Sequence, residues 1–238
     1  MPVFRSIVFS AALAGLIVGV VISVAQFFGT VPLIQQSEVY ERKAAATPAA
    51  HSHASSSNDQ DKTHHHESEW EPEEGFQRNA FTVGANILTA IGFALLLTGV
   101  YAIRDRHVTW REGLLWGLAG FVVFTAAPGL GLPPELPGMP VADLTARQIW
   151  WIATAAATAG GLGLLALRPA AWSAVLGLAL IALPHLIGAP VAPESHSAVP
   201  AALSHRFIVV VTLTSLLFWA LLGVATSLAF ERISRPQP

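Results

Sequence analysis

Histidines beside carboxylates are the residues of this chain whose types and spacing best suit chemistry. Five of the nine histidines lie between residues 51 and 66, and an acidic run begins directly afterwards at Glu67. Imidazole and carboxylate groups bind borderline divalent cations such as Co²⁺, Ni²⁺, Zn²⁺ and Cu²⁺. Neutral imidazole is the ligand form, so capture weakens as the pH falls below about 6.5, the pKa of free histidine. The candidate metal ligands here are His51, His53, His64, His65 and His66.

The segment that contains these histidines is too polar to fold alone. Residues 44–66 are rich in Ser, Ala, Asp and His and include no Phe, Tyr or Trp, so they bury too little apolar surface to offset the entropy of ordering. We therefore expect the polar stretch 29–78 to be a largely disordered loop. A flexible loop wraps several histidines around one ion but imposes no geometry, which predicts metal capture with weak selectivity. A solvated linker whose histidines bind nothing is the alternative.

A second set of candidate ligands lies near the ends of apolar segments. His185 follows Pro184 about one turn inside the end of such a segment, and Pro184 has no amide N–H, which leaves a backbone carbonyl free at membrane depth. Ionisable groups within a membrane span are functional candidates by default. A hydrogen bond from an interfacial His185 to a neighbouring loop is the alternative. His196, His205 and Glu194 lie in the next polar stretch and would complete a metal site with His185.

Glu135 lies in an apolar loop with a fixed path. Residues 129–140 contain four prolines and three glycines, so the segment resembles a re-entrant plug at the outer mouth of a bundle more than a solvated linker. Glu135 would serve there as an ion ligand or gate. Alternatively, its carboxylate accepts hydrogen bonds from the turn's own backbone or pairs with Arg147 or Arg206, and we favour this second interpretation.

One polar stripe runs along a single predicted helix. Asn79, Thr82, Asn86 and Thr89 are spaced by 3, 4 and 3 residues, which places them on one helix face. Such a stripe lines a polar path for a partly hydrated cation, or it forms interhelical hydrogen bonds that each contribute about 0.6 kcal/mol. We favour the hydrogen bonds.

Helices that cross a membrane must position these side chains. The chain has 238 residues, of which 53% are hydrophobic and 12% charged, and its mean hydropathy is +0.55, whereas a soluble domain has about 25% charged residues. Six uncharged segments reach the length of about 20 residues that a spanning helix needs, which predicts an all-α polytopic bundle of about six transmembrane helices. A count of five follows if the third or the fifth segment only re-enters the membrane. The expected helices are 1–28 and, after the outer loop, a core within 79–235 made of 79–103, 111–128, 148–167, 170–189 and 207–230.

Basic residues predict the orientation of the bundle. Arg5 precedes the first segment, and Arg104, Arg106 and Arg111 crowd one short loop. Cytoplasmic loops have such an excess of Lys and Arg, so we expect both termini in the cytoplasm and the histidine-bearing loop outside. A cleavable signal peptide is the alternative for the first segment, but the apolar core of this segment is longer than the about 7–15 residues that are usual in signal peptides.

Several function classes are excluded. The chain has no cysteine, which removes disulfides and thiolate ligands, and its net charge of −2 without a basic tract is unlike that of a nucleic-acid binder. It contains no Gly-x-x-x-x-Gly-Lys-Ser/Thr, His-Glu-x-x-His or Gly-x-Ser-x-Gly motif, on which many ATPases, metalloproteases and serine hydrolases depend. We therefore expect a protein that is not an enzyme and has no organic cofactor.

Four short motifs resemble those of one membrane family. They occur in order along the chain as EWEP at 69–72, GLPPELPG at 131–138, RQIWW at 147–151 and PHLIGAP at 184–190. On these motifs the chain resembles the family called probable cobalt transporter subunit CbtA. The resemblance implies a bacterial inner-membrane protein that takes up Co²⁺ for cobalamin synthesis with a small single-span, histidine-containing partner, CbtB. It also implies five spans, whereas the charge pattern favours six.

The residues and the resemblance together predict a membrane subunit that captures a divalent transition metal outside and passes it inward. Co²⁺ is the expected ion, while Ni²⁺ and Zn²⁺ stay open because only the resemblance selects cobalt. A tighter site near the outer mouth is expected to use His185 and Glu135. A non-transporting metal sensor, or a scaffold for a separate transporter or chelatase, is the alternative. Assembly as a homo-oligomer also stays open.

Overall fold

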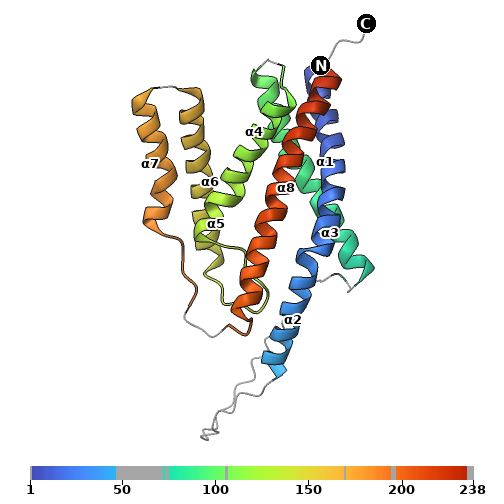
Figure 1. Cartoon of the computed structure of the whole chain (residues 1–238), viewed down its shortest axis with the longest axis vertical. Coiled ribbons are helices and arrows are strands. Elements are labelled where there is room, and N and C mark those ends of the chain that lie inside the picture. The colour runs from blue at the N-terminus through green and yellow to red at the C-terminus, as the bar shows by residue number, and fades with distance from the viewer. Residues whose placement is uncertain are drawn as a thin grey trace, which may run out of the picture.

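The computed structural model describes residues 2–46, 72, 75–104, 107–168, 170–193 and 197–234. Within these ranges every regular element is a helix, which confirms the predicted all-α polytopic fold. The long helices alternate in direction, and α1 begins at the same end of the bundle at which α8 ends (Figure 1). We call this end the terminal end and the opposite end the loop end. The elements are α1 (Pro2–Phe28), α2 (Thr30–Ala46), α3 (Phe76–Arg104), α4 (Trp110–Phe121), the π-helical turn η1 (Val122–Ala126), α5 (Ala127–Gly131), α6 (Leu144–Leu167), α7 (Ala171–Ile187) and α8 (Ala201–Ser234).

Five helices of the described chain are long and apolar enough to cross a membrane. They are α1, α3, the continuous unit from α4 to α5, α6 and α8. The expected sixth, α7, has 17 residues and is therefore about 26 Å long, against about 30 Å for a hydrocarbon core. It ends at Ile187, and the residue that follows, Gly188, has a φ of +91°, which favours glycine. The helix α7 runs antiparallel to α6 (Figure 1) and packs closely on it where Gly161 faces Gly177. A count of six spans, with α7 as the short sixth member, stays a prediction.

The beginning of the expected outer loop is helical. We expected 29–78 to be largely disordered, which is wrong for residues 30–46, because these form α2 as a bent continuation of α1. One face of α2 is buried through Leu33 and Ser37, and Leu33 packs with Leu136 and Phe207 of other elements. Tertiary packing therefore stabilises a helix that its polar sequence alone does not predict. Residues 76–78 of the same stretch open α3, while 47–71 and 73–74 lie outside the described residues.

Glycines bring the helices close together in the half of the bundle nearest the terminal end. A Cβ atom at Gly15 would lie 2.6 Å from the Ile91 backbone, and one at Gly223 would lie 2.2 Å from the Gly113 carbonyl oxygen. Small residues at such crossings allow the backbone contact that drives association in lipid. The resulting core of α1, α3, α4 and α8 contains Ala90, Ala94, Tyr101, Trp219 and Leu222.

Basic side chains are numerous at the terminal end. They stand at the start of α1, the end of α3, the start of α4, the turn between α6 and α7, and the last turn of α8 (Figure 1). Long apolar helices between charged ends are the arrangement of a membrane protein. These residues are Arg5, Arg104, Arg111, Arg168 and Arg232.

Candidate functional site

A cavity of about 850 Å³ opens among α1, α2, α3 and α8 in the half of the bundle nearest the loop end. Residues from 22 to 42 of α1 and α2, from 75 to 89 at the start of α3, and from 207 to 218 of α8 line it. Phe27, Thr30 and Pro32, on either side of the junction of α1 and α2, line the cavity. The cavity is thus built by the helix that we did not expect and by the helix with the polar stripe.

All four residues of the predicted polar stripe line this cavity. Asn79, Thr82, Asn86 and Thr89 face it from successive turns of α3, over a length of about 15 Å. Thr82 and Thr89 are exposed, and the Thr82 hydroxyl donates a hydrogen bond to the Arg78 carbonyl oxygen at 2.9 Å. Along most of its length the stripe therefore presents hydroxyl and amide groups to an open space.

One member of the stripe also joins two helices. Asn86 Nδ2 donates hydrogen bonds to Gln26 Oε1 at 2.7 Å and to Ser23 Oγ at 3.0 Å. Both acceptors belong to α1, so this contact is the interhelical hydrogen bonding that we favoured for the stripe. The side chains of Ser23, Gln26 and Asn86 thus form a hydrogen-bonded polar cluster between α1 and α3.

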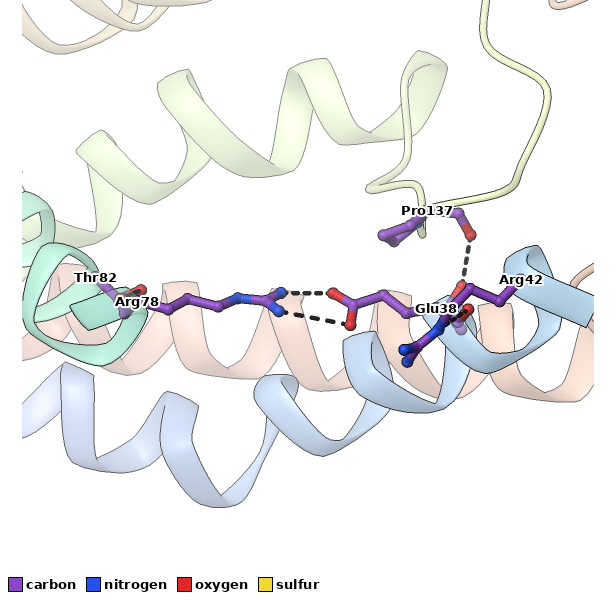
Figure 2. Close-up of polar contacts among 6 residues, drawn as sticks. Glu38, Arg42, Arg78, Thr82 and Pro137 are labelled. Carbon is purple, nitrogen blue, oxygen red and sulfur yellow. Dashed lines mark hydrogen bonds and ion pairs between the residues drawn. The ribbon is translucent and has the colours of Figure 1, made fainter. Parts of the chain in front are cut away.

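An ion pair spans the part of the cavity nearest the loop end. The Arg78 guanidinium on α3 reaches the Glu38 carboxylate on α2, with Nη2 at 2.5 Å from Oε1 and Nη1 at 3.5 Å from Oε2 (Figure 2). The side chains of Arg78 and Glu38 are 40% and 22% exposed, so water screens the pair only in part. The sequence pattern missed both residues. Arg78 precedes Thr82 by four positions and extends the polar stripe by one turn, which is the signal that would have found it.

Cationic groups outnumber anionic ones on the cavity wall. Of the described lining residues, Glu38, Arg42 and Arg78 are charged. Arg42 folds back on its own helix, where its Nε donates a hydrogen bond to the Glu38 carbonyl oxygen at 3.3 Å. Among the described lining residues, a cation in the cavity therefore meets a single carboxylate, which is already paired with an arginine.

The cavity is closed toward the terminal end. Its lining stops at Ile22, Thr89 and Phe218, and the next residues along α3 and α8, Ala90 and Trp219, are buried in the glycine-packed core. The described residues thus form a cavity with polar groups along α3, and packed side chains close it toward the terminal end.

The proline-rich loop fixes Glu135 in an ion pair. Glu135 Oε2 lies 2.6 Å from Arg147 Nη2 at the start of α6, which is one of the two pairings that we expected as the alternative to an ion ligand. The neighbouring Leu136 is buried against α2 and α8, and Ser37 of α2 donates a hydrogen bond to the Pro137 carbonyl oxygen at 2.6 Å (Figure 2). The loop therefore lies across the loop end of the bundle and contacts α2 and α8.

His185 lies against an aromatic ring. Its imidazole meets the Trp150 ring edge to face, with the ring centroids 5.8 Å apart, and Trp150 Nε1 donates a hydrogen bond to the Pro184 carbonyl oxygen at 3.3 Å. Gly131 provides room for this tryptophan, because a Cβ atom there would lie 2.3 Å from the indole. Arg147 and Trp150 are three positions apart on α6, so Glu135 and His185 both contact side chains of the same helix face.

The other predicted ligands are dispersed or lie outside the described residues. His205 is exposed on the second turn of α8, while Glu194, His196 and the loop residues His51, His53, His64, His65 and His66 are outside the described ranges. Among the described residues, no three His, Asp or Glu side chains converge on a point that a metal ion could occupy. The predicted metal site around His185 and Glu135 therefore stays a prediction.

Comparisons with known proteins identify the family. A search of curated proteins found no match, and neither did a search of solved structures. Residues 4–231, nearly the whole chain, match the family described as probable cobalt transporter subunit (CbtA). This match confirms the resemblance that the short motifs indicated and fits the apolar helices of the fold. The chain therefore belongs to the family of probable cobalt transporter subunits, CbtA.

Proposed function

We propose that the protein is the membrane subunit through which a divalent transition metal, Co²⁺, enters the cell, and that the polar cavity holds the ion on its way. The observation that supports this proposal is that the four residues of the polar stripe line one cavity that is closed toward the terminal end. A polar space open on one side is what a transporter needs before it moves its cargo inward.

The chemistry of the wall suits an ion that keeps part of its water. Hydroxyl and amide oxygens such as those of Thr82, Asn86 and Thr89 are neutral ligands for a divalent cation. Six waters occupy about 180 Å³ at liquid density, so a cavity of about 850 Å³ has room for a hydrated ion. Weak, multiple contacts of this kind let an ion enter and also leave.

Histidines and carboxylates would supply the ion to the cavity. Imidazole and carboxylate groups of the outer loop, from His51 to His66, raise the local concentration of a borderline metal without selecting it strongly. His185 and Glu135, with Glu194, His196 and His205, would provide a tighter outer site. In this scheme both termini lie in the cytoplasm of a bacterium and the loop end faces outward.

A partner completes the system in this proposal. The family description calls the protein a subunit, and a small single-span protein resembling CbtB is the partner that we propose. Co²⁺ taken up in this way would serve cobalamin synthesis. The protein would move its cargo without catalysing a reaction on it, and Ni²⁺ and Zn²⁺ are the competitors against which selectivity is measured.

Accumulation of labelled Co²⁺ tests the proposal. Cells that lack their own cobalt uptake would express the chain with and without its partner, in wild-type form and as the Thr82→Val/Thr89→Val double variant. These substitutions remove two hydroxyls from the cavity wall and keep side-chain shape, so we expect uptake to fall. Thr212→Val is the matched control, because Thr212 does not line the cavity, while its hydroxyl bonds to the Ile208 carbonyl oxygen of its own helix as that of Thr82 bonds to Arg78. Metal binding without uptake by any form would instead favour a sensor or a scaffold.

A further inference from the structure

Three arginines at the terminal end hold their guanidinium groups over aromatic rings. In each pair the guanidinium carbon atom, Cζ, lies at most 6.0 Å from the centre of the ring, which is the range of a cation–π contact. The ring therefore holds the guanidinium group in place. We call Arg5, Arg104 and Arg111 the stacked arginines, and they lie over Phe9 at 6.0 Å, Trp116 at 5.5 Å and Trp110 at 5.4 Å.

The stacked arginines retain free N–H donors. An aromatic ring covers a face of the planar guanidinium group, whereas its five N–H donors point outward in the plane. All three side chains are exposed, and among the described residues none of the three guanidinium groups forms an ion pair or donates a hydrogen bond. A guanidinium group with unused donors along its edge is suited to bind two oxygen atoms of a phosphate group at once.

Three arginines of the loop end use their donors within the protein. Arg78 and Arg147 form ion pairs with Glu38 and Glu135, and Arg42 donates a hydrogen bond to the Glu38 carbonyl oxygen. An excess of basic residues at one end of a bundle accounts for the number of arginines at the terminal end. It does not account for guanidinium groups that are held on aromatic rings with their donors unused.

Positive charge and apolar surface lie side by side at the terminal end, where α1 begins and α8 ends (Figure 1). The segments 1–5, 104–112, 168–170 and 231–238 together contain seven arginines and three acidic residues. One of the acidic residues, Glu112, accepts hydrogen bonds from the Thr109 amide and hydroxyl groups at 2.9 and 3.0 Å and so caps α4. The exposed apolar side chains next to the stacked arginines in the sequence include Phe4, Ile103 and Trp110.

We propose that the stacked arginines bind the headgroup phosphates of anionic phospholipids in the membrane leaflet at the terminal end. Such a lipid provides phosphate oxygens for the guanidinium edges and acyl chains for the apolar side chains beside them. Its negative charge complements the excess of arginine in these segments, and basic residues next to membrane helices attract anionic lipids. This lipid-binding surface goes beyond the proposed function and depends neither on the cavity nor on its cargo.

Native mass spectrometry of the full-length protein in detergent tests the proposal. The protein is mixed with equal amounts of phosphatidylglycerol and phosphatidylcholine, and the ratio of the two bound lipids is measured. Both lipids contain a phosphate group, but only phosphatidylglycerol has a net negative charge. We expect wild type to prefer phosphatidylglycerol, and glutamine at any stacked arginine to lower the ratio by about fivefold, which corresponds to about 1 kcal/mol for each basic residue near a membrane surface. Equal binding of the two lipids by wild type would overturn the proposal.

Matched variants separate the stacked arginines from the total charge of the terminal end. Arg168→Gln removes an exposed arginine of the same end that lies over no aromatic ring of the described chain, and it should leave the ratio unchanged. A loss as large as that of Arg111→Gln would show that only total charge matters and would contradict the proposal. Arg111→Lys keeps the charge but removes the planar donors, so its ratio should lie between those of wild type and Arg111→Gln. A wild-type ratio in this variant would contradict binding through the guanidinium edge.

Two further measurements keep the result interpretable. Arg104 contacts Trp116 of another helix, whereas Arg5 and Arg111 lie over rings of their own helices. Arg5→Gln and Arg111→Gln therefore test the proposal even if Arg104→Gln fails to fold, and melting temperatures verify the fold of each variant. Excess inorganic phosphate should leave bound phosphatidylglycerol unchanged, because it provides no acyl chains. Displacement of the lipid by phosphate would instead show a site for a soluble anion and overturn the proposal.

Discussion

Asn86 of α3 donates a hydrogen bond from Nδ2 to Gln26 Oε1 of α1 at 2.7 Å, at the level where the polar cavity gives way to the packed core. Seven residues earlier along α1, Gly19 lies so close to Ile87 that a Cβ atom there would be 2.6 Å from the Ile87 Cα atom. Asn86 therefore lies next to a residue at which the two helices are in close contact. Asn86 both holds α1 to α3 and presents a polar group to the cavity.

The Asn86–Gln26 contact should contribute measurably to stability. Asn86→Ala removes two hydrogen bonds to α1, which in membrane proteins contribute about 0.6 kcal/mol each. We expect the free energy of unfolding in detergent to fall by about 1 kcal/mol, and the fluorescence of the seven tryptophans can follow this change. Asn86→Ala and Gln26→Ala should be less than additive when combined, because they break the same contact. Full additivity would show that the two side chains do not interact.

Glycines at the helix crossings should tolerate no side chain, whereas glycines on open faces should. Gly223→Ala would place Cβ 2.2 Å from the Gly113 carbonyl oxygen, and backbone cannot yield as a flexible side chain does. We expect this variant to lose about 1–3 kcal/mol of stability or to fail to fold.

Gly84→Ala is the control for that substitution. No atom lies within 4 Å of a Cβ atom at Gly84, and alanine favours the helix by up to about 1 kcal/mol. In thermal unfolding, Gly223→Ala should therefore lower the melting temperature and Gly84→Ala should raise it. Similar melting temperatures would mean that α4 and α8 do not cross as closely as described.

Water should reach the cavity as far as Thr89. Because the chain has no cysteine, a single Thr89→Cys substitution gives a unique thiol about 16 Å along α3 from Arg78. A membrane-impermeant maleimide applied from the loop side should label it in intact membranes.

Leu88→Cys provides the comparison, because Leu88 is 72% exposed on a different surface of the same helix and does not line the cavity. In a bilayer this position faces lipid, so labelling should be slow. Equal, slow labelling of both thiols would show that the cavity is not filled with water.

His185 should matter for uptake through its imidazole nitrogen atoms. We expect His185→Ala to lower Co²⁺ accumulation more than deletion of residues 51–66 does, because a positioned ligand contributes more than a flexible one. His185→Phe is the decisive comparison, since a phenyl ring can keep the edge-to-face contact with Trp150 but cannot bind metal. Full uptake by the phenylalanine variant would assign His185 to packing against Trp150 alone.

Features that lie within one helix were predictable from the sequence. The spacing of Asn79, Thr82, Asn86 and Thr89 predicted a shared face, and this face lines the cavity. Glycines four residues apart, Gly15 and Gly19, lie at a close helix contact as such spacing predicts. Helical periodicity fixes these relations before any tertiary contact forms.

Features that depend on distant segments were not predictable. Glu38 and Arg78 are forty positions apart, and Glu38 belonged to a stretch whose average composition indicated disorder. The helix α2 forms where Leu33 and Ser37 find partners in the proline-rich loop and in α8, and no local pattern encodes those partners. The ion pair of Glu38 with Arg78 thus depends on the position of α2 beside α3, which the local sequence does not determine.

The hydrogen bond from Ser37 to Pro137 gives the molecule a mechanical linkage. Two residues before Pro137, Glu135 forms an ion pair with Arg147 at the first turn of α6. Four prolines between residues 129 and 140 make this segment of the chain stiff. Because this connection is short and stiff, we expect a tilt of α2 to displace the start of α6. An ion that enters the cavity and shifts α2 would thereby also shift the helix pair α6–α7, which does not line the cavity.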